Sequence, residues 1–358
     1  MTYMDKILSI CIPTLNRSLY LEKLLMSIFS QFDSELGENI EICINDDSLQ
    51  DDTEYVVNLY RAMKTFDIIY HRNYNNTGLE NAIFDVVDMG TGKYRWVISD
   101  DDLVIKGGIR IVLEQAKTFL YDYIIVEANT FDDRNGWSNE RIYCLKNTEY
   151  NNKMQFNNIL RDLFIPMTHI CISIFSKNFW YSSKIRGDDL SFKYFPHMRR
   201  IFSMLPMSEK KTLAIATPII DARAYNYSYT KNNLVIFYHH LFNILDSLNN
   251  FEAASKCYVK TKVHTHFSSL VCIKNLVRSK AFPTLEGSYL VNYDVYRKIR
   301  RNLTLKERCI ILFVVLVPQH VLRFLWLLLK KIKASVSDPI KFFFRILISL
   351  QSNLNKGK

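Results

Sequence analysis

The chain is poor in the residues that interrupt regular structure, with 10 Gly and 8 Pro among 358 residues. It also shows no low-complexity tract and no internal repeat. These absences argue against a disordered, fibrous or linker-dominated protein. Hydrophobic residues form 48% of the chain, which is enough to bury a large core. We therefore expect one large domain with a smaller appendage.

Closely spaced cysteine pairs are absent as well. The seven cysteines are odd in number, and none is spaced from another like the ligands of a zinc site. Most lie inside apolar runs such as SICIP and EICIN, which predicts small buried side chains in a reducing compartment. The N-terminal run is too short and too acidic for a secretory signal. We expect a cytoplasmic protein.

Net positive charge is scarce outside the C-terminal segment. The formal net charge is +10, but residues 301–358 alone hold 11 Lys and Arg against two acidic residues, so the remainder of the chain is nearly neutral. The basic residues of this tail are interleaved with Leu, Phe, Ile and Trp. Such a composition favours an anionic membrane surface as the partner and argues against a nucleic acid.

The sequence also lacks an apolar run long enough to predict a membrane-spanning helix. The segment 309–333 is strongly apolar, but it is interrupted below the roughly 18 to 20 residues that a spanning helix needs by Pro318, Gln319, His320 and Arg323. A second basic and apolar run, 339–350, predicts a short helix. Both are typical of helices that lie in the membrane interface, with Trp326 among the acyl chains and lysines at the headgroups. The alternative is a helical hairpin packed on the main domain.

What the first 130 residues do contain is an alternation of strand and helix patterns. Short β-branched runs predict strands at 6–12, 40–44, 67–70, 94–99 and 123–127. Apolar residues at helical spacing predict helices between them, among them a helix at 79–89. This order predicts an α/β fold with a mostly parallel sheet covered by helices. The region 141–229 is less regular, with strands expected at 170–175 and 212–215 and a helix near 196–205, and 233–281 is mostly helical in pattern.

Polar residues follow four of these predicted strands. They form the clusters 13–16, 45–48, 72–73 and 100–102. In open α/β sheets, ligands bind beyond the carboxyl ends of the strands. We therefore expect the four clusters to converge on one edge of the sheet.

The most unusual cluster is the run of three aspartates in WVISDDDLV, 96–104. Adjacent carboxylates repel one another, so crowding them after a buried strand costs stability unless a cation offsets the charge. Mg²⁺ or Mn²⁺ is often held by one or two carboxylates together with substrate phosphates. The alternative is an exposed acidic turn before the next helix, helped by Gly107 and Gly108.

Four stretches together resemble the inverting, nucleotide-sugar-dependent glycosyltransferase family 2, which has the GT-A fold. They are LSICIPTLNR at 8–17, EICINDDSLQDDT at 41–53, RNYNNTGLENAI at 72–83 and YRWVISDDDLV at 94–104. A looser likeness at 167–180 and 194–205 is to bacterial O-antigen transferases of the abequosyltransferase type.

The resemblance implies a role for particular residues. It places the nucleotide-sugar donor against Pro13, Thr14, Asn16, Asp46, Asp47, Arg72, Asn73, Asp100 and Asp101. It implies Mg²⁺ or Mn²⁺ as cofactor, held by Asp102 and Asp100, with Asp102 the favoured ligand. The family often has Gly after its paired acids, where this chain has Ser48, so the shape of that loop departs from the family pattern.

An inverting transfer also needs a base that takes the proton of the acceptor hydroxyl. The resemblance implies a carboxylate some 80 to 100 residues after the metal motif, where Asp188 and Asp189 lie. An exposed loop before a helix explains these two acids equally well. His197, at a predicted helix start, would bind the donor diphosphate or complete the metal shell, although a packed histidine is the commoner case.

The sequence thus predicts three segments: a GT-A domain at 1–230, with a nucleotide-binding half at about 1–130 and an acceptor half at about 131–230, a helical extension at 231–300, and a membrane-associating tail at 301–358. The resemblance implies an enzyme peripheral to the inner face of the bacterial plasma membrane. It would move a sugar to a polyprenyl-diphosphate-linked glycan during O-antigen or surface polysaccharide assembly. One alternative is a soluble or protein acceptor. Another is a membrane-tethered, non-catalytic nucleotide-binding or scaffold protein.

Overall fold

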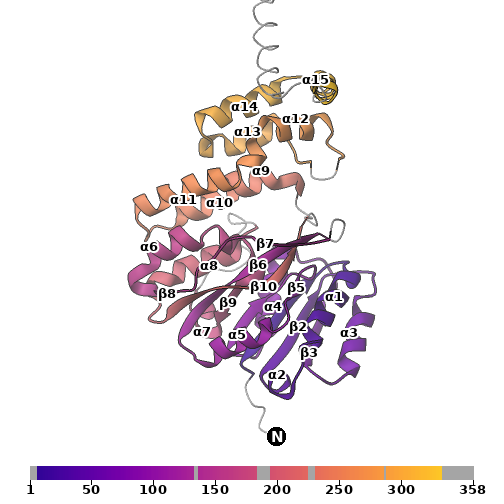
Figure 1. The fold of residues 1–358 in the computed structure, drawn as a ribbon, viewed down its shortest axis with the longest axis vertical. Coiled ribbons are helices and arrows are strands. Elements are labelled where there is room, and N and C mark those ends of the chain that lie inside the picture. The colour runs from indigo at the N-terminus through magenta and orange to yellow at the C-terminus, as the bar shows by residue number, and fades with distance from the viewer. Residues whose placement is uncertain (1–5, 133–135, 184–193, 225–229, 286–287, 333–358) are drawn as a thin grey trace, which may run out of the picture. The chain divides into compact units, whose positions relative to one another are not determined.

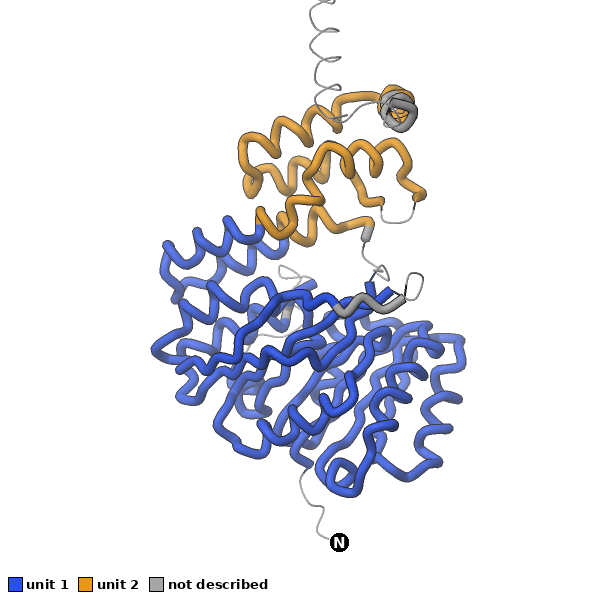
Figure 2. The backbone as a smooth tube through the Cα atoms, viewed as in Figure 1, with its two compact units in different colours: residues 1–227, 240–263 blue, residues 228–239, 264–358 orange. Residues whose placement is uncertain are grey.

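The computed structural model describes residues 6–132, 136–183, 194–224, 230–285 and 288–332. The chain divides into two compact units, shown in Figure 2. Unit 1 comprises residues 1–227 and 240–263, and unit 2 comprises residues 228–239 and 264–358.

Unit 1 is built around a large sheet whose first four strands are parallel, in the spatial order β3-β2-β1-β4 (Figure 1). These strands are β1 (Leu8–Thr14), β2 (Ile40–Asp46), β3 (Asp67–Arg72) and β4 (Tyr94–Val97). Every residue of β2 and β4 is buried, as expected for strands that are covered on both faces. The predicted parallel sheet is confirmed in this half of the unit.

Helices that follow the strands place apolar residues at helical spacing on the sheet. They are α1 (Ser18–Phe29), α2 (Ser34–Asn39), α3 (Thr53–Ala62), α4 (Leu79–Met89) and α5 (Gly108–Lys117). In α4, for example, Ile83, Val86 and Val87 are buried, and the helix packs against β1 and β2. Gly78 precedes α4 with φ of 85°, a left-handed conformation that glycine adopts without strain.

The rest of the sheet is mixed, which corrects the expectation of a mostly parallel sheet. The order continues from β4 as β9-β6-β10-β5. The strands are β5 (Leu103–Val104), β6 (Tyr121–Asp132), β7 (Gly136–Arg141), β8 (Thr148–Asn151), β9 (Ser173–Ser176) and β10 (Lys211–Arg223). Only β6 and β10 pair in parallel here; β9 is antiparallel to β4 and β6, and β5 and β8 are antiparallel to β10.

Helical segments form much of the remaining described chain, and those within 233–281 agree with the helical pattern predicted there. They are α6 (Asn152–Leu163), α7 (Lys177–Ser182), α8 (Pro196–Met204), α9 (Asn233–Val235), α10 (Leu241–Ser247), α11 (Ala253–His266), α12 (Ile273–Ala281), α13 (Tyr293–Ile299), α14 (Leu305–Leu316) and α15 (Gln319–Ile332).

In unit 2, α12 packs against both α14 and α15. The Nζ of Lys280 in α12 donates to the carbonyl oxygens of Val314 and Val317, which satisfies groups that the C-terminus of α14 leaves without helical partners. Within the described residues, no helix is both long and apolar enough to cross a membrane. The predicted helix at 339–350 lies outside the described residues.

Candidate active site

The polar clusters after β1, β2 and β4 meet at one edge of the sheet. The hydroxyl of Thr14 donates to Asp100 at 2.8 Å, and the amide of Asn16 donates to the hydroxyl of Ser48 at 2.7 Å. Asn16 has φ of 54°, a conformation that asparagine tolerates better than most residues. Pro13, half-buried, lies beside Asn45 in the β1–β2 register. The topology thus brings together residues far apart in the sequence.

The acids at the end of β2 are buried and held by hydrogen bonds. Asp46 accepts from the hydroxyl of Tyr70 and from the amide of Ser48, both at 2.8 Å. Asp47 accepts from the side-chain amide of Asn73 at 2.6 Å and from the backbone amide of Thr77 at 3.0 Å. These bonds fix the direction of both carboxylates, so the edge is ordered before any ligand binds.

Arg72 fixes the loop that departs from the family pattern. Its guanidinium donates to the carbonyl oxygens of Ser48 at 3.2 Å and Leu49 at 2.7 Å, and it pairs with Glu54 at 3.3 Å. The guanidinium therefore orders the chain after Asp47, in place of the close turn that a glycine would allow.

The three aspartates are buried, so they do not form an exposed acidic turn. Asp100, Asp101 and Asp102 are 3%, 8% and 6% exposed. Arg17 forms ion pairs with Asp100 at 3.0 Å and with Asp101 at 3.2 Å. Asp102 instead accepts from the backbone amide of Arg223 at 3.0 Å.

Arg223 also supports the aspartate turn through its side chain. Its Nε donates to the carbonyl oxygen of Asp101 at 2.9 Å, and its guanidinium lies over the rings of Tyr20 and Phe131, at 4.7 and 4.4 Å from their centroids. Because Arg223 ends β10, the turn is held by the second half of the sheet as well as by β4.

The electrostatics of this turn fit a cation. Burial raises the pKa of Asp100 to about 6, against the lowering effect of Arg17. Burial, and then the charge of Asp101, raises the pKa of Asp102 to about 8. The ionised forms of both carboxylates are therefore disfavoured, and a nearby positive charge would stabilise them. Carboxylate oxygens are also the ligands that Mg²⁺ and Mn²⁺ prefer. Asp100 and Asp102 thus suit such an ion, which a substrate's phosphates would also ligate.

No group of three or more His, Cys, Asp or Glu side chains that could hold a metal ion by themselves is found in the described part of the chain. A hard divalent ion in a nucleotide site commonly takes only one or two protein carboxylates. The two-carboxylate set at the aspartate turn agrees with that pattern.

His197, a predicted donor-binding residue, is almost fully buried. Its Nε2 lies 2.8 Å from the carbonyl oxygen of Met167, and burial lowers the pKa of its imidazole to about 4. These contacts describe a neutral, packed ring. The predicted bases Asp188 and Asp189 lie outside the described residues.

Sequence reasoning assigned no role to Tyr70, Thr77, Arg17 or Arg223. Tyr70 carried a weak signal, since it stands two residues before Arg72 and the end of β3 and so shares a face of that strand with it. Arg223 carried none, because the expected strand at 212–215 is much shorter than β10. Only the antiparallel pairing of β10 with β5 brings Arg223 to the aspartates.

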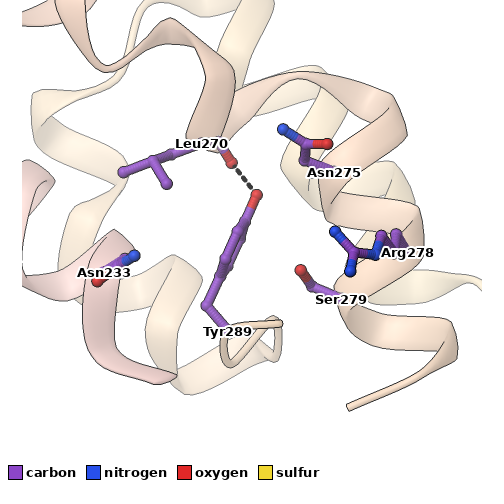
Figure 3. Close-up of a pocket in the computed structure, with 6 residues that line it drawn as sticks. All are labelled: Asn233, Leu270, Asn275, Arg278, Ser279 and Tyr289. Atoms are coloured by element: carbon purple, nitrogen blue, oxygen red, sulfur yellow. Dashed lines mark hydrogen bonds between the residues drawn. The ribbon is translucent and has the colours of Figure 1, made fainter. Parts of the chain in front are cut away.

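A separate cavity of about 130 Å³ lies in unit 2. Figure 3 shows the residues that line it: Asn233, Leu270, Asn275, Arg278, Ser279 and Tyr289. The hydroxyl of Tyr289 donates to the carbonyl oxygen of Leu270 at 2.5 Å. None of these residues belongs to the predicted donor site.

Comparison with solved structures shows a GT-A-like fold. A Staphylococcus aureus TarS fragment in complex with UDP aligns with a TM-score of 0.56 and 13% identity, over 88% of each chain. The mannosyltransferase PcManGT from Pyrobaculum calidifontis, solved with GDP-Man and Mn²⁺, aligns with a TM-score of 0.51 and 12% identity, over 87% of this chain and 85% of that one.

Sequence comparison is more specific. The abequosyltransferase RfbV of Salmonella typhimurium is 29% identical over 63% of this chain and 69% of its own. A Campylobacter jejuni GalNAc(5)-diNAcBac-PP-undecaprenol beta-1,3-glucosyltransferase is 31% identical over 30% of this chain and 34% of its own. Both relatives are enzymes, which disfavours the non-catalytic alternative. Residues 9–179 match the model of glycosyl transferase family 2, and the chain therefore contains a domain of this family of glycosyltransferases.

Proposed function

We propose that this glycosyltransferase uses a divalent cation to move a sugar, with inversion, from a nucleotide-sugar donor to a lipid-linked glycan during assembly of O-antigen or another surface polysaccharide. The observation that carries the proposal is the buried run of Asp100, Asp101 and Asp102 at the sheet edge that also holds Asp46 and Asp47. Such an edge is where α/β sheets bind nucleotides.

The donor's base and ribose would lie against the first two strands. Asp46 and Asp47 are oriented acceptors for base or ribose donors, while Thr14 and Asn16 lie between them and the aspartate turn. Arg72 and Asn73, at the end of β3, border this part of the site through their hydrogen bonds to Ser48 and Asp47. A nucleoside diphosphate laid along this path would bring its phosphates to Asp100 and Asp102.

The reaction breaks the bond between the anomeric carbon and a diphosphate oxygen, so negative charge develops on the leaving group and positive charge on the sugar ring. Asp102 and Asp100 would hold a divalent ion, which would supply positive charge beside the diphosphate. Arg17 adds positive charge at the same place, and the aspartate carboxylates favour the developing charge of the ring. Asp189 or Asp188 would take the proton of the acceptor hydroxyl.

A lipid-linked acceptor is supported by the names of the relatives and by unit 2. The C. jejuni relative acts, by its name, on a glycan linked to undecaprenyl diphosphate. In α14 and α15, Leu316, Phe324 and Leu327 are more than half exposed, an arrangement typical of helices that lie on a membrane. The enzyme would then work at the inner face of the plasma membrane, where acceptor and cytoplasmic donor meet.

The experiment is a donor and acceptor screen with the full chain in vesicles. Purified protein is given Mn²⁺ or Mg²⁺, a panel of sugar nucleotides and undecaprenyl-diphosphate glycans, and release of nucleoside diphosphate is measured together with the anomeric configuration of the product. We expect release from one class of nucleotide, loss of release with EDTA, and an inverted product.

Truncation tests the acceptor class. A chain ending after residue 300 should release nucleoside diphosphate on the lipid-linked acceptor far more slowly than the full chain. Equal rates for the two chains, or faster transfer to a soluble glycan or a protein, would count against the lipid-linked acceptor. Full activity in EDTA would count against the cation.

A further inference from the structure

Arg17 is held by its backbone at the start of α1 and reaches the aspartate turn with its side chain. Its carbonyl oxygen accepts from the amides of Tyr20 and Leu21 at 2.9 and 3.0 Å. The side chain then spans to carboxylates 83 and 84 residues away in the sequence. The backbone position is thus fixed, whereas the long side chain retains several rotatable bonds.

The guanidinium takes the position that a bridging cation would take. One nitrogen, Nη1, lies 3.0 Å from Oδ1 of Asp100 and 3.2 Å from Oδ2 of Asp101. The second oxygen of Asp100 accepts from Thr14. A single positive group therefore joins two neighbouring carboxylates that would otherwise repel each other at close range.

Arg17 forms ion pairs with Asp100 and Asp101, the two aspartates that lie nearest its guanidinium. Arg223 contributes a backbone amide to Asp102 and directs its Nε to a carbonyl oxygen. A divalent ion can approach these carboxylates only if the guanidinium of Arg17 moves away from it, because two positive charges at short range repel each other.

The surroundings of Arg17 permit such a movement. Its side chain is 23% exposed, in contrast to that of Arg95, which is fully buried and held by the carbonyl oxygens of Val87, Gly90 and Gly92. Arg95 is fixed on every side, whereas Arg17 borders solvent at the sheet edge.

We propose that Arg17 is an exchangeable counter-ion of the aspartate site. In the ligand-free protein its guanidinium pairs with Asp100 and Asp101. When a divalent ion binds Asp100 and Asp102, the guanidinium leaves the carboxylates and pairs with the diphosphate of the donor. This inference rests on the proposed cation and nucleotide site. It adds that the guanidinium of Arg17 competes with the metal ion for the carboxylates until the nucleotide binds.

The first test measures binding of Mn²⁺ alone by the full chain, using the electron paramagnetic resonance signal of free Mn²⁺. Arg17→Gln should bind Mn²⁺ at least about tenfold more tightly than the native protein, because a competing positive charge is gone. Arg17→Lys, which keeps the charge, should lie closer to the native affinity. Arg110→Gln is the matched control, since Arg110 also joins two carboxylates, those of Asp33 and Glu35, away from the site.

Equal or weaker Mn²⁺ binding by Arg17→Gln, with binding by the native chain intact, would overturn the counter-ion role and leave the proposed function standing. Arg17→Lys binding as tightly as Arg17→Gln would overturn the charge argument. Failure of both the native chain and Arg17→Gln to bind Mn²⁺ at millimolar concentration would overturn this inference and the proposed cation together.

A second test needs no variant, which matters if Arg17→Gln folds poorly. Phenylglyoxal modification of arginines in the native chain is followed by peptide mass spectrometry. Mn²⁺ alone should speed modification of Arg17 several-fold, and Mn²⁺ with a nucleoside diphosphate from the panel UDP, GDP, CDP and dTDP should slow it again. Modification of Arg110 should not change. An unchanged rate at Arg17 on addition of saturating Mn²⁺ would overturn the exchange.

Discussion

The aspartate turn of unit 1 buries charged side chains, whereas α14 and α15 of unit 2 expose large apolar ones. At the turn, three adjacent carboxylates are less than a tenth exposed; in α14 and α15, Leu316, Phe324 and Leu327 are 69%, 64% and 55% exposed. Folded chains usually leave clusters of like charge in water and gather large apolar side chains inside. Each region therefore carries a cost that a partner outside the chain would offset, a cation with a diphosphate in one case and an apolar surface in the other.

The strongest way to test the first half of this comparison is to remove the charge of Asp102. Asp102→Asn should reduce release of nucleoside diphosphate about a thousandfold or more, because a proposed metal ligand is lost. Asp122→Asn is the matched control, a buried acid bonded to Ser176 and Ser208 outside the site. It should lose stability but keep its turnover per folded molecule. Turnover by Asp102→Asn within tenfold of native would refute the metal role.

The pH dependence of stability tests whether unit 1 buries the imidazole of His197 in its neutral form. The pKa of His197 is lowered to about 4 in the folded chain, against about 6.5 in the unfolded chain. The unfolded chain binds the proton more tightly, so stability falls as pH drops from about 6.5 to 4, by up to about 3 kcal/mol from this residue.

Urea unfolding between pH 7 and pH 4 checks this prediction. In His197→Gln, which cannot titrate there but can still donate to Met167, the decline should be shallower by the same amount. Parallel stability curves for the native chain and the variant would contradict a neutral, buried imidazole. Unchanged donor binding by the variant would assign His197 a packing role.

The second half of the comparison is tested by placing charge on the exposed apolar face of α15. Phe324→Glu with Leu327→Glu should weaken binding to vesicles containing phosphatidylglycerol by about tenfold or more, because apolar burial is lost and negative charge is added. The matched control is Met63→Glu at the C-cap of α3 in unit 1, where the side chain of Met63 is 55% exposed. Vesicle flotation measures the difference. Equal flotation of the double variant and the native chain would show that α15 does not contact the membrane.

The smallest effect is expected at the nucleotide end of the site. Tyr70→Phe removes the hydroxyl that donates to Asp46 at 2.8 Å. The affinity for nucleoside diphosphate should fall about threefold to tenfold, the usual value of one hydrogen bond. A ligand-induced melting shift measures it, with the exposed Tyr74→Phe as control. An unaltered shift in Tyr70→Phe would show that Asp46 keeps its orientation without the hydroxyl.

The regular part of unit 1 was predictable because its signals are local. The pattern of apolar residues predicts α4 at its observed bounds, Leu79–Met89, and predicts β2 and β3 to within two residues. The position of the aspartates after a buried strand was equally readable. These features depend on residues next to one another in the chain.

The parts that sequence reasoning missed depend on contacts between distant residues. The two-residue strand β5 has no periodicity long enough to be recognised. The strand β9 overlaps the strand expected at 170–175 but begins three residues later. Residues 170–172, expected in a strand, form a turn of 3₁₀ helix instead, and the carbonyl oxygen of Cys171 accepts from the indole of Trp96. The role of Arg17 likewise appears only when β1 and β4 lie side by side.

The attachment of β10 to the aspartate turn limits how the protein can be divided. Val104 pairs with Ile220, and Asp102 receives the amide of Arg223, so residues more than a hundred positions downstream complete the end of the nucleotide-binding half. A fragment of about residues 1–130 would retain the four predicted polar clusters yet lack the hydrogen bond that Arg223 gives to Asp102. Attempts to graft or express that half alone as a nucleotide-sugar sensor should therefore include the chain through β10.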